Sequence, residues 1–191
     1  MNMKLYCADV RGADEKKAAA PGRSPRAGSA FAASLLAYAA REFWGAETLP
    51  RIGTGKTGAP FFVDFPDWHF SLSHSRSHVL AAVSDYPVGA DIETRRERPP
   101  AFIGKLTTRR EREDFDFFEL WVLRESLYKL TGEGDLRKMR FSRLNGAIMA
   151  PVEGVRCRLY GDIPGCAAAV SCFRGEFPEA VIMVKTCEIC S

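Results

Sequence analysis

Histidine is scarce in this sequence, and several familiar catalytic signatures are missing. Only three of the 191 residues are histidines, His69, His74 and His78, so we do not expect a zinc site built from several of them. No Gly-x-Ser-x-Gly pattern is present, which argues against a serine-elbow hydrolase. The stretch 53–58 (GTGKTG) is rich in glycine but lacks the spacing of a phosphate-binding P-loop. We expect a flexible loop there.

Long apolar runs are also lacking. The longest, residues 30–40 and 79–83, fall short of the roughly 20 residues that a membrane helix needs, so no membrane association is expected. The N-terminus has no basic start, apolar stretch or cleavage site, and a cytoplasmic location is therefore expected. The net charge of +3 tolerates an anionic partner without requiring one. No nucleic-acid-binding motif is recognised, and no nucleic-acid partner is expected.

The six cysteines do not suggest a disulfide framework, because nothing else indicates a secreted chain. Cys7, Cys157 and Cys172 lie in apolar stretches and are expected to be small buried hydrophobic residues. Cys187 and Cys190 form a Cys-x-x-Cys pair, but no second pair or histidine pair accompanies it. We interpret this pair as part of the tail rather than as a metal site.

Hydrophobic periodicity predicts an α+β protein, and 46% apolar residues are enough to build a core. Strands are expected at residues 3–10, 60–63, 68–72, 78–84, 88–92, 155–160, 167–173 and 180–185, and helices at 29–44 and 108–131. This order favours two α+β halves docked together. We place the N-terminal half at residues 1–86 and the C-terminal half at 87–191.

Two carboxylates follow an apolar strand. Asp91 and Glu93 flank Ile92, and side chains two residues apart in a strand point to the same face. Carboxylates placed this way repel each other unless a cation lies between them, and hard oxygen ligands suit Mg²⁺. The alternative is a solvated strand end in which the two carboxylates pair with Arg95 and Arg96.

A third carboxylate, Glu125, lies in the apolar helix expected at 108–131, where an unpaired charge is costly. Lys129 follows four residues later and shares its helical face. The two residues either form an ordinary surface ion pair or supply a metal ligand and a phosphate-binding cation.

His74 follows the strand expected at 68–72 and is flanked by Ser73 and Ser75. Histidine and serine at a strand end can donate hydrogen bonds to phosphate oxygens. The alternatives are a hydrogen-bonded turn histidine, or a nucleophile and base, although a serine next to a histidine in sequence rarely has the geometry of a catalytic triad.

Taken in order, these segments resemble the 4′-phosphopantetheinyl transferase superfamily, and in particular its monomeric surfactin-synthetase-activating type. The family's Ser-His-Ser segment corresponds to residues 73–75, and its (Ile/Val)-Gly-(Ile/Val)-Asp-(Ile/Val)-Glu segment to residues 88–93. Its Trp-x-x-Lys-Glu-(Ala/Ser)-x-x-Lys helix corresponds to residues 121–129, followed by Gly132 and Gly134. Each motif alone is weak, whereas the three in order identify the family.

The resemblance implies two similar α+β halves related by a pseudo-twofold axis, with coenzyme A held between them, and a monomer. It implies that Asp91, Glu93 and Glu125 bind Mg²⁺. It also implies that His74 and Lys129 hold the phosphates of coenzyme A, with Ser73 nearby. The implied reaction transfers the 4′-phosphopantetheine arm of coenzyme A to a serine of an apo acyl or peptidyl carrier protein and releases 3′,5′-ADP.

Some positions depart from the family pattern or align weakly with it. Arg124 replaces the lysine that usually precedes the motif glutamate, and Ala59 replaces the lysine of a Gly-Lys-Pro segment, a role that Lys56 is the candidate to take over. Arg23 or Arg26 would grip the nucleotide 3′-phosphate. Glu111 is the counterpart of a family acidic residue.

The serine proton requires a general base, for which Glu125 and Glu111 are both candidates, and Lys129 would supply fixed positive charge where negative charge develops. Two rival functions stay open at this point. One is a Mg²⁺-dependent phosphohydrolase or nuclease that uses the same carboxylates. The other is a non-catalytic homologue that binds coenzyme A or the carrier protein.

Overall fold

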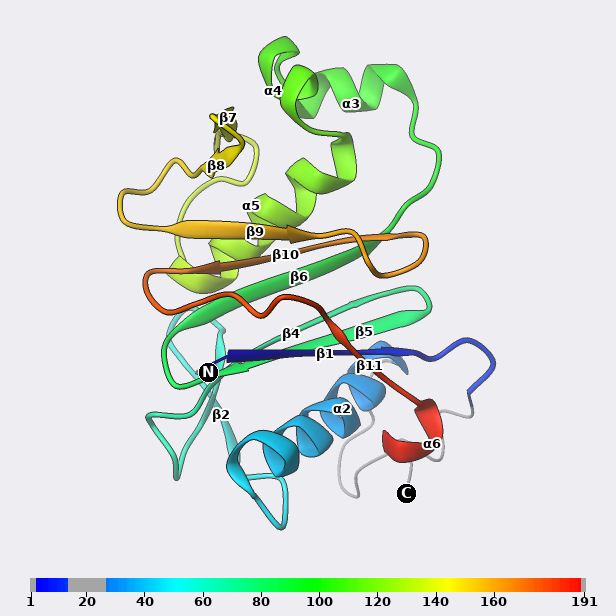
Figure 1. The fold of residues 1–191 in the computed structure, drawn as a ribbon, viewed down its shortest axis with the longest axis vertical. Coiled ribbons are helices and arrows are strands. Elements are labelled where there is room, and N and C mark those ends of the chain that lie inside the picture. Colours follow the sequence, from blue (N-terminus) through cyan, green and yellow to red (C-terminus); the bar gives the residue numbers. More distant parts are fainter. Residues whose placement is uncertain (1–2, 14–26, 190–191) are drawn as a thin grey trace.

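The first of two β-sheets contains both the first and the last strand of the chain. The computed structural model describes residues 3–13 and 27–189. The strands of this sheet lie in the order β11 (Ile182–Val184), β1 (Met3–Asp9), β5 (His78–Ser84) and β4 (His69–Ser75). β1 is antiparallel to β5 and parallel to β11, so the chain returns at its end to the sheet in which it began (Figure 1).

The second sheet is antiparallel and has three strands, in the order β6 (Val88–Thr94), β10 (Cys166–Cys172) and β9 (Arg156–Tyr160). Two short hairpins lie outside the sheets, formed by β2 (Ile52–Thr54) with β3 (Pro60–Phe62) and by β7 (Ser142–Leu144) with β8 (Ala147–Met149). The helices are α2 (Ala27–Trp44), α3 (Pro100–Leu106), α4 (Arg109–Asp114), α5 (Phe117–Thr131) and α6 (Thr186–Ile189).

Strand alternation divides the apolar side chains among three cores. On β1, Leu5 and Cys7 belong to a core that the two sheets share, whereas Tyr6 and Ala8 belong to a core with α2. A third core joins α5 to the second sheet through residues such as Leu127. Each sheet therefore contributes one face to the shared core and packs its own long helix on the other face.

The α+β class predicted from the sequence is confirmed. The pseudo-twofold relation between the halves and the boundary at residues 86/87 stay predictions. Although β11 lies beyond that boundary in sequence, it pairs with β1 of the first sheet. Among the described residues, no helix is both long and apolar enough to cross a bilayer.

The single helix expected at 108–131 is in fact two helices. Asp116 caps α5 by accepting hydrogen bonds from the amides of Phe118 and Glu119, and Thr108 forms an equivalent capping box at the start of α4. The capping side chains thus end one helix and begin the next, where the hydrophobic periodicity alone predicts a single helix. The C-terminus of α5 is as expected, because Gly132 takes the left-handed conformation with φ 70°.

The burial expected from the sequence is found for Cys7 and Cys172 but only in part for Cys157. Cys7 and Cys172 are fully buried and Cys157 is half-buried, and no disulfide forms among the cysteines that the structure describes. Burial raises the pKa of the Cys7 thiol to about 12, consistent with a hydrophobic role. Cys187 is exposed. Its partner in the Cys-x-x-Cys pattern, Cys190, lies outside the described residues.

Candidate active site

The two sheets meet along β4 and β6, where hydrogen bonds from serine side chains join the two strands. Ser71, Ser73 and Ser75, here called the serine ladder, project from alternate positions of β4 towards β6. Their hydroxyls accept hydrogen bonds from three backbone amides of β6, those of Ala90 at 2.9 Å, Ile92 at 3.3 Å and Thr94 at 2.9 Å. The seam between the sheets is therefore held by side chains and is lined with polar groups.

The serine ladder also holds the two carboxylates that the sequence placed on one strand face. Ser73 donates to Asp91 Oδ1 at 2.6 Å, and Ser75 donates to Glu93 Oε2 at 2.8 Å. Asp91 is buried, whereas Glu93 is half-buried and also lies 3.5 Å from Arg96 Nη1. The ion-pair alternative thus holds for Glu93 and Arg96.

Arg95 does not take part in that alternative. It pairs with Asp116 and Glu119 near the start of α5. Asp91 therefore has no arginine partner among the described residues and depends on the seam for its hydrogen bonds.

Helix α5 brings the third carboxylate to the same place. Glu125, together with Asp91 and Glu93, lines a cleft of about 300 Å³ at the seam. The cleft is lined by Leu72, Ser73, His74, Asp91, Ile92, Glu93, Trp121, Glu125 and Lys129. Five residues from the three sequence motifs, in addition to the two carboxylates of β6, thus meet at one site: Ser73, His74, Trp121, Glu125 and Lys129.

The close approach of α5 to β6 depends on Gly89. A Cβ atom at this position would lie 2.0 Å from the carbonyl oxygen of Ser126 and 2.6 Å from the amide nitrogen of Leu130, far inside contact distance. The hydroxyl of Ser126 lies 2.8 Å from that of Ser171 on β10, which ties the same helix face to the sheet. Only glycine lets the helix come near enough to face Asp91 with Glu125 and Lys129.

Lys129, on α5, contacts both strands at the seam. Its ammonium donates to Asp91 Oδ1 at 2.7 Å and to the carbonyl oxygens of Leu72 and Ala90, each at 3.1 Å. These carbonyls belong to β4 and β6, so one cation contacts both sheets. The surface pair with Glu125 that the spacing suggested is replaced by a pair with Asp91.

Glu125 is the least satisfied acid of the site. It is half-buried and has no hydrogen-bond or ion-pair partner among the described residues. Burial and then the charge of Asp91 raise the pKa of the Glu125 carboxyl, Lys129 opposes this shift, and the charge of Glu93 adds to it. A half-buried carboxylate facing two others gains stability from an added cation or a proton.

The donor set fits Mg²⁺ chemically but is not a preformed cage. In the described part of the chain, no group of three or more His, Cys, Asp or Glu side chains is already arranged to hold a metal. Asp91 is bonded to Lys129 and Ser73, and Glu93 to Ser75 and Arg96. Because Mg²⁺ commonly uses one or two carboxylates and completes its shell with water and phosphate, oxygens of this kind suit it.

A second cavity of about 380 Å³ adjoins the first and shares Leu72 and Lys129 with it. Its walls come from the loop 57–60, the start of β4, Val88 and the end of α5 with Tyr128. The two neighbouring cavities thus lie between the β2–β3 hairpin and the carboxylates.

One predicted contact of coenzyme A, Lys56, does not line these cavities. Lys56 lies in the exposed turn of the β2–β3 hairpin and is absent from both linings, although its neighbours Thr57 and Gly58 contribute. Arg26, like Arg23, lies outside the described residues. His74 is exposed and lines the cleft, and it lies within β4 rather than after the strand.

Glu111 is not placed as a general base would be. It is 2% exposed, does not line the cleft, and accepts a hydrogen bond from Arg124 Nη2 at 2.7 Å and another from the Thr108 amide at 2.8 Å. Burial acts to raise the pKa of Glu111, but the hydrogen bonds from Thr108 and Arg124 outweigh it and lower the pKa. Glu111 thus forms a buried ion pair with Arg124 outside the cleft, and its catalytic role stays a prediction.

The sequence analysis missed the function of Ser71 and Ser75 and that of Gly89. The alternation of serine at 71, 73 and 75 was a signal, since serines on one face of an otherwise apolar strand need polar partners. The contacts of Gly89 depend on how a helix and a strand far apart in sequence meet, which no local pattern encodes.

The comparisons with known proteins agree with this site. A family model described as the 4′-phosphopantetheinyl transferase superfamily matches residues 87–148, which include both carboxylate motifs. The 4′-phosphopantetheinyl transferase Sfp of Bacillus subtilis (strain 168) is 33% identical over 153 residues, covering 71% of this chain and 68% of that protein. The transferase ffp of Bacillus subtilis is 29% identical over the same shares of the two chains.

A further relative matches over a shorter region. The transferase gsp of Aneurinibacillus migulanus is 38% identical over 87 residues, covering 40% of this chain and 36% of that protein. The long match to Sfp, the family model and the cleft where the motifs meet lead to one assignment. The chain belongs to the 4′-phosphopantetheinyl transferase superfamily, in its surfactin-synthetase-activating type, and is an enzyme of that class.

Proposed function

We propose that this protein transfers the 4′-phosphopantetheine arm of coenzyme A to a serine of an apo acyl or peptidyl carrier protein in a Mg²⁺-dependent reaction. The observation that carries the proposal is the meeting of Asp91, Glu93, Glu125, Lys129 and His74 in one cleft, in a chain of this family. We further propose that the enzyme works as a cytoplasmic monomer, with the cleft between its two halves.

Coenzyme A is long, and we propose that it occupies both neighbouring cavities. We place its phosphates near Lys129, which lines both cavities, and near His74 and Ser73, which line the smaller one. Lysine provides a compact positive charge for phosphate, and histidine and serine provide hydrogen-bond donors. The apolar wall of the larger cavity, with Phe70, Leu72 and Val88, favours the non-phosphate portions of the ligand.

Asp91, Glu93 and Glu125 would hold Mg²⁺, which when bound neutralises the charge that develops on the phosphates. Half-buried Glu125 supports this assignment, because a cation would offset the burial and the repulsion by Asp91 that raise the pKa of its carboxyl. Lys129, which pairs with Asp91 in this structure, would hold a phosphate oxygen of the substrate.

In the transfer step, the carrier serine oxygen forms a bond to the β-phosphorus as the bond from that phosphorus to the bridging oxygen breaks. The 3′,5′-ADP leaves with the bridging oxygen, and the serine proton passes to a base. Glu125 is the base we propose, since Glu111 is buried against Arg124. Lys129 stabilises the charge on the leaving phosphate.

The test is to incubate the protein with coenzyme A, Mg²⁺ and a panel of apo carrier proteins and to weigh each carrier by mass spectrometry. The proposal expects a mass gain equal to one phosphopantetheine arm on at least one carrier, together with stoichiometric 3′,5′-ADP. A phosphohydrolase would instead release product from coenzyme A without a carrier. A non-catalytic binding protein would give neither product, and either of these results would contradict the proposal.

A further inference from the structure

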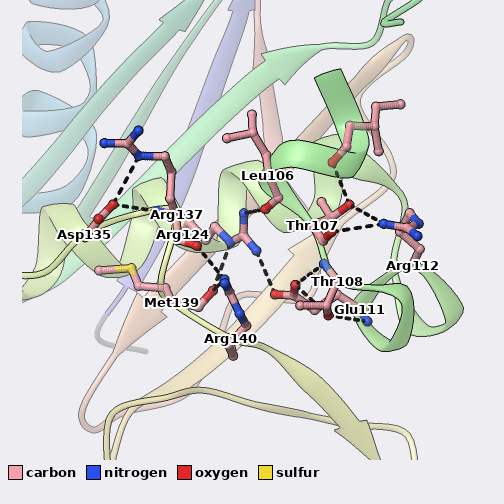
Figure 2. A network of polar contacts seen from close by, with 11 residues as sticks. Leu106, Thr107, Thr108, Glu111, Arg112, Arg124, Asp135, Arg137, Met139 and Arg140 are labelled. Atoms are coloured by element: carbon pink, nitrogen blue, oxygen red, sulfur yellow. Dashed lines mark hydrogen bonds and ion pairs between the residues drawn. The ribbon is translucent and has the colours of Figure 1, made fainter. Parts of the chain in front are cut away.

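Arg124 is the largest fully buried side chain described, with 0% of its surface exposed, and it immediately precedes Glu125. Its guanidinium contacts three separate segments (Figure 2). Nε donates to the carbonyl of Met139 at 3.1 Å, Nη1 to the carbonyl of Leu106 at 2.6 Å, and Nη2 to Glu111 Oε1 at 2.7 Å. The segments are the loop after α5, the last residue of α3, and α4.

Two of these segments have little else to hold them. We call residues 100–114, which contain α3 and α4, the arm. α3 has no buried residue, and Glu111 is the single buried residue of α4. Other contacts of the arm lie at the surface, where the Phe102 ring meets that of Phe117 at 5.7 Å and Asp114 accepts a hydrogen bond from the Arg143 amide at 2.9 Å. A buried ion pair thus takes the place that an apolar core usually has in docking two helices.

The arm also reaches a small cavity next to the active-site cleft. Phe102 of the arm lines this cavity together with Glu93 and Trp121, and these two residues line the carboxylate cleft as well. Displacing the arm therefore alters the surroundings of Glu93 and Trp121. Displacing α5 disturbs Glu125 itself.

The geometry points to Arg124 as a positioning residue for the proposed transfer reaction, and this inference rests on that proposed function. The guanidinium of Arg124 holds the arm and the segment around Met139 against α5. These contacts fix the rotation of α5 about its axis, and this rotation directs Glu125 into the cleft. Catalytic groups must be held within about 0.5 Å and 10–20° of their productive geometry. Because neighbouring helix residues point about 100° apart, Arg124 can be held in the interior while Glu125 faces the cleft.

A lysine at position 124 would keep the charge but not the geometry. Its ammonium is a single nitrogen, whereas the three acceptors of Arg124 belong to different segments and meet different nitrogens of a planar fork. Arg124→Lys is therefore expected to keep the pair with Glu111 and to lose hydrogen bonds to the carbonyls of Leu106 and Met139. Arg124→Met removes all three contacts and leaves Glu111 as a buried unpaired acid.

The first readout is hydrogen exchange of the full chain, which does not depend on activity. We expect Arg124→Met to raise amide exchange across 100–114 and around Glu125 about tenfold, and Arg124→Lys about threefold, with exchange in β1 and β5 unchanged. Arg112→Met is the matched control, since Arg112 lies on the same arm and bonds Thr107 without reaching α5. It is expected to exchange as the wild type does.

The second readout separates positioning from a loss of folded protein. A smaller folded fraction lowers the maximal rate but leaves the half-saturating Mg²⁺ concentration unchanged. Misplacing Glu125 raises that concentration, and we expect a rise of about threefold or more in Arg124→Met.

If Arg124→Met does not fold, Arg124→Lys provides the test, because its positive charge can still pair with Glu111. Wild-type exchange in the arm in a folded Arg124 variant would overturn the anchoring, and an unchanged half-saturating Mg²⁺ concentration would overturn the positioning role. Failure of the wild-type enzyme to modify any carrier would instead contradict the proposed function, and the exchange measurement would then still decide whether Arg124 holds the arm.

Discussion

At the residue scale, the site is a balance of charges that depends on Lys129. This ammonium pairs with Asp91 at 2.7 Å and bonds carbonyls of both β4 and β6, while Glu125 beside it has no such partner. The site thus contains two acids with a cationic partner, Asp91 and Glu93, and one without, Glu125. A cation bound in the cleft would give Glu125 the positive partner that it lacks.

Glu125→Gln tests that asymmetry through stability. The substitution removes a half-buried negative charge that Asp91 and Glu93 repel, so it is expected to raise the melting temperature of the metal-free protein. The same variant is expected to lose transfer activity. Thermal unfolding in a chelator measures the effect, with Glu113→Gln on the exposed face of α4 as the control. A melting temperature below that of the wild type would contradict the assigned repulsion.

Glu111 makes a prediction about pH. Its pKa is lowered in the folded protein, so its contribution to stability is present above its ordinary pKa of 4.5 and is lost as the pH falls through the folded value. At pH 7, Glu111→Gln is expected to cost about 3 kcal/mol, because the buried charge of Arg124 loses its partner. Denaturant unfolding at several pH values should show the gap between wild type and variant narrowing below about pH 4.5. A gap that stays constant down to pH 3 would contradict the ion-pair account.

At the element scale, the active site is the contact between α5 and β6. The two elements come together at Gly89, where any Cβ would collide with the backbone of α5. Glu125 and Lys129 on the helix then face Asp91 and Glu93 on the strand, and the serine ladder fixes the strand from its other side. The catalytic geometry thus depends on two short contacts of β6, one with α5 at Gly89 and the other with the serine ladder of β4.

Gly89→Ala is expected to separate these elements. The methyl group would lie 2.0 Å from a backbone oxygen, which no side-chain adjustment can relieve, so we expect a loss of about 3 kcal/mol or more and loss of transfer. Gly104→Ala in α3 is the matched control, since nothing lies within 4 Å of its added Cβ. That variant should be neutral or more stable by about 0.5–1 kcal/mol. Denaturant unfolding compares them, and a Gly89→Ala protein of wild-type stability would refute the close-approach argument.

Much of the site could be predicted at this scale, and the reasons for success and failure are physical. Asp91 and Glu93 share a strand face and Glu125 and Lys129 share a helix face, and both relations follow from local periodicity. The partner of Lys129 could not be predicted, because the pairing with Asp91 depends on how the helix packs on the strand. The burial of Glu111 against Arg124 could not be predicted either, because it depends on the break between α4 and α5.

At the scale of the whole molecule, the two sheets are joined by a shared core and by the polar seam. Leu5 and Cys7 of β1 share that core with Ala90 and Ile92 of β6, so each sheet covers a face of the other. The sequence predicted the α+β class and most of the strands. It could not predict that β11 returns to β1, since a three-residue strand carries no signal of its partner.

This mutual dependence predicts that the N-terminal half does not fold alone. A fragment of residues 1–86 would lack β11 and would expose the face of its sheet that carries Leu5, Cys7, Leu80 and Ala82. We expect a near-ultraviolet circular dichroism spectrum without fine structure and no cooperative thermal transition, with the full chain as the control. A cooperative transition in the fragment would contradict the picture of one shared core.

The central claim is that the acids at the seam perform the transfer, and it is tested most directly by the rate of carrier modification. Intact-mass measurement of an apo carrier with coenzyme A and saturating Mg²⁺ would compare wild type, Asp91→Asn, Glu125→Gln and the control Glu113→Gln. We predict that the two seam variants stay folded and lose about 10²–10³-fold in rate, while Glu113→Gln keeps the wild-type rate. Wild-type rates in either folded seam variant would contradict the account.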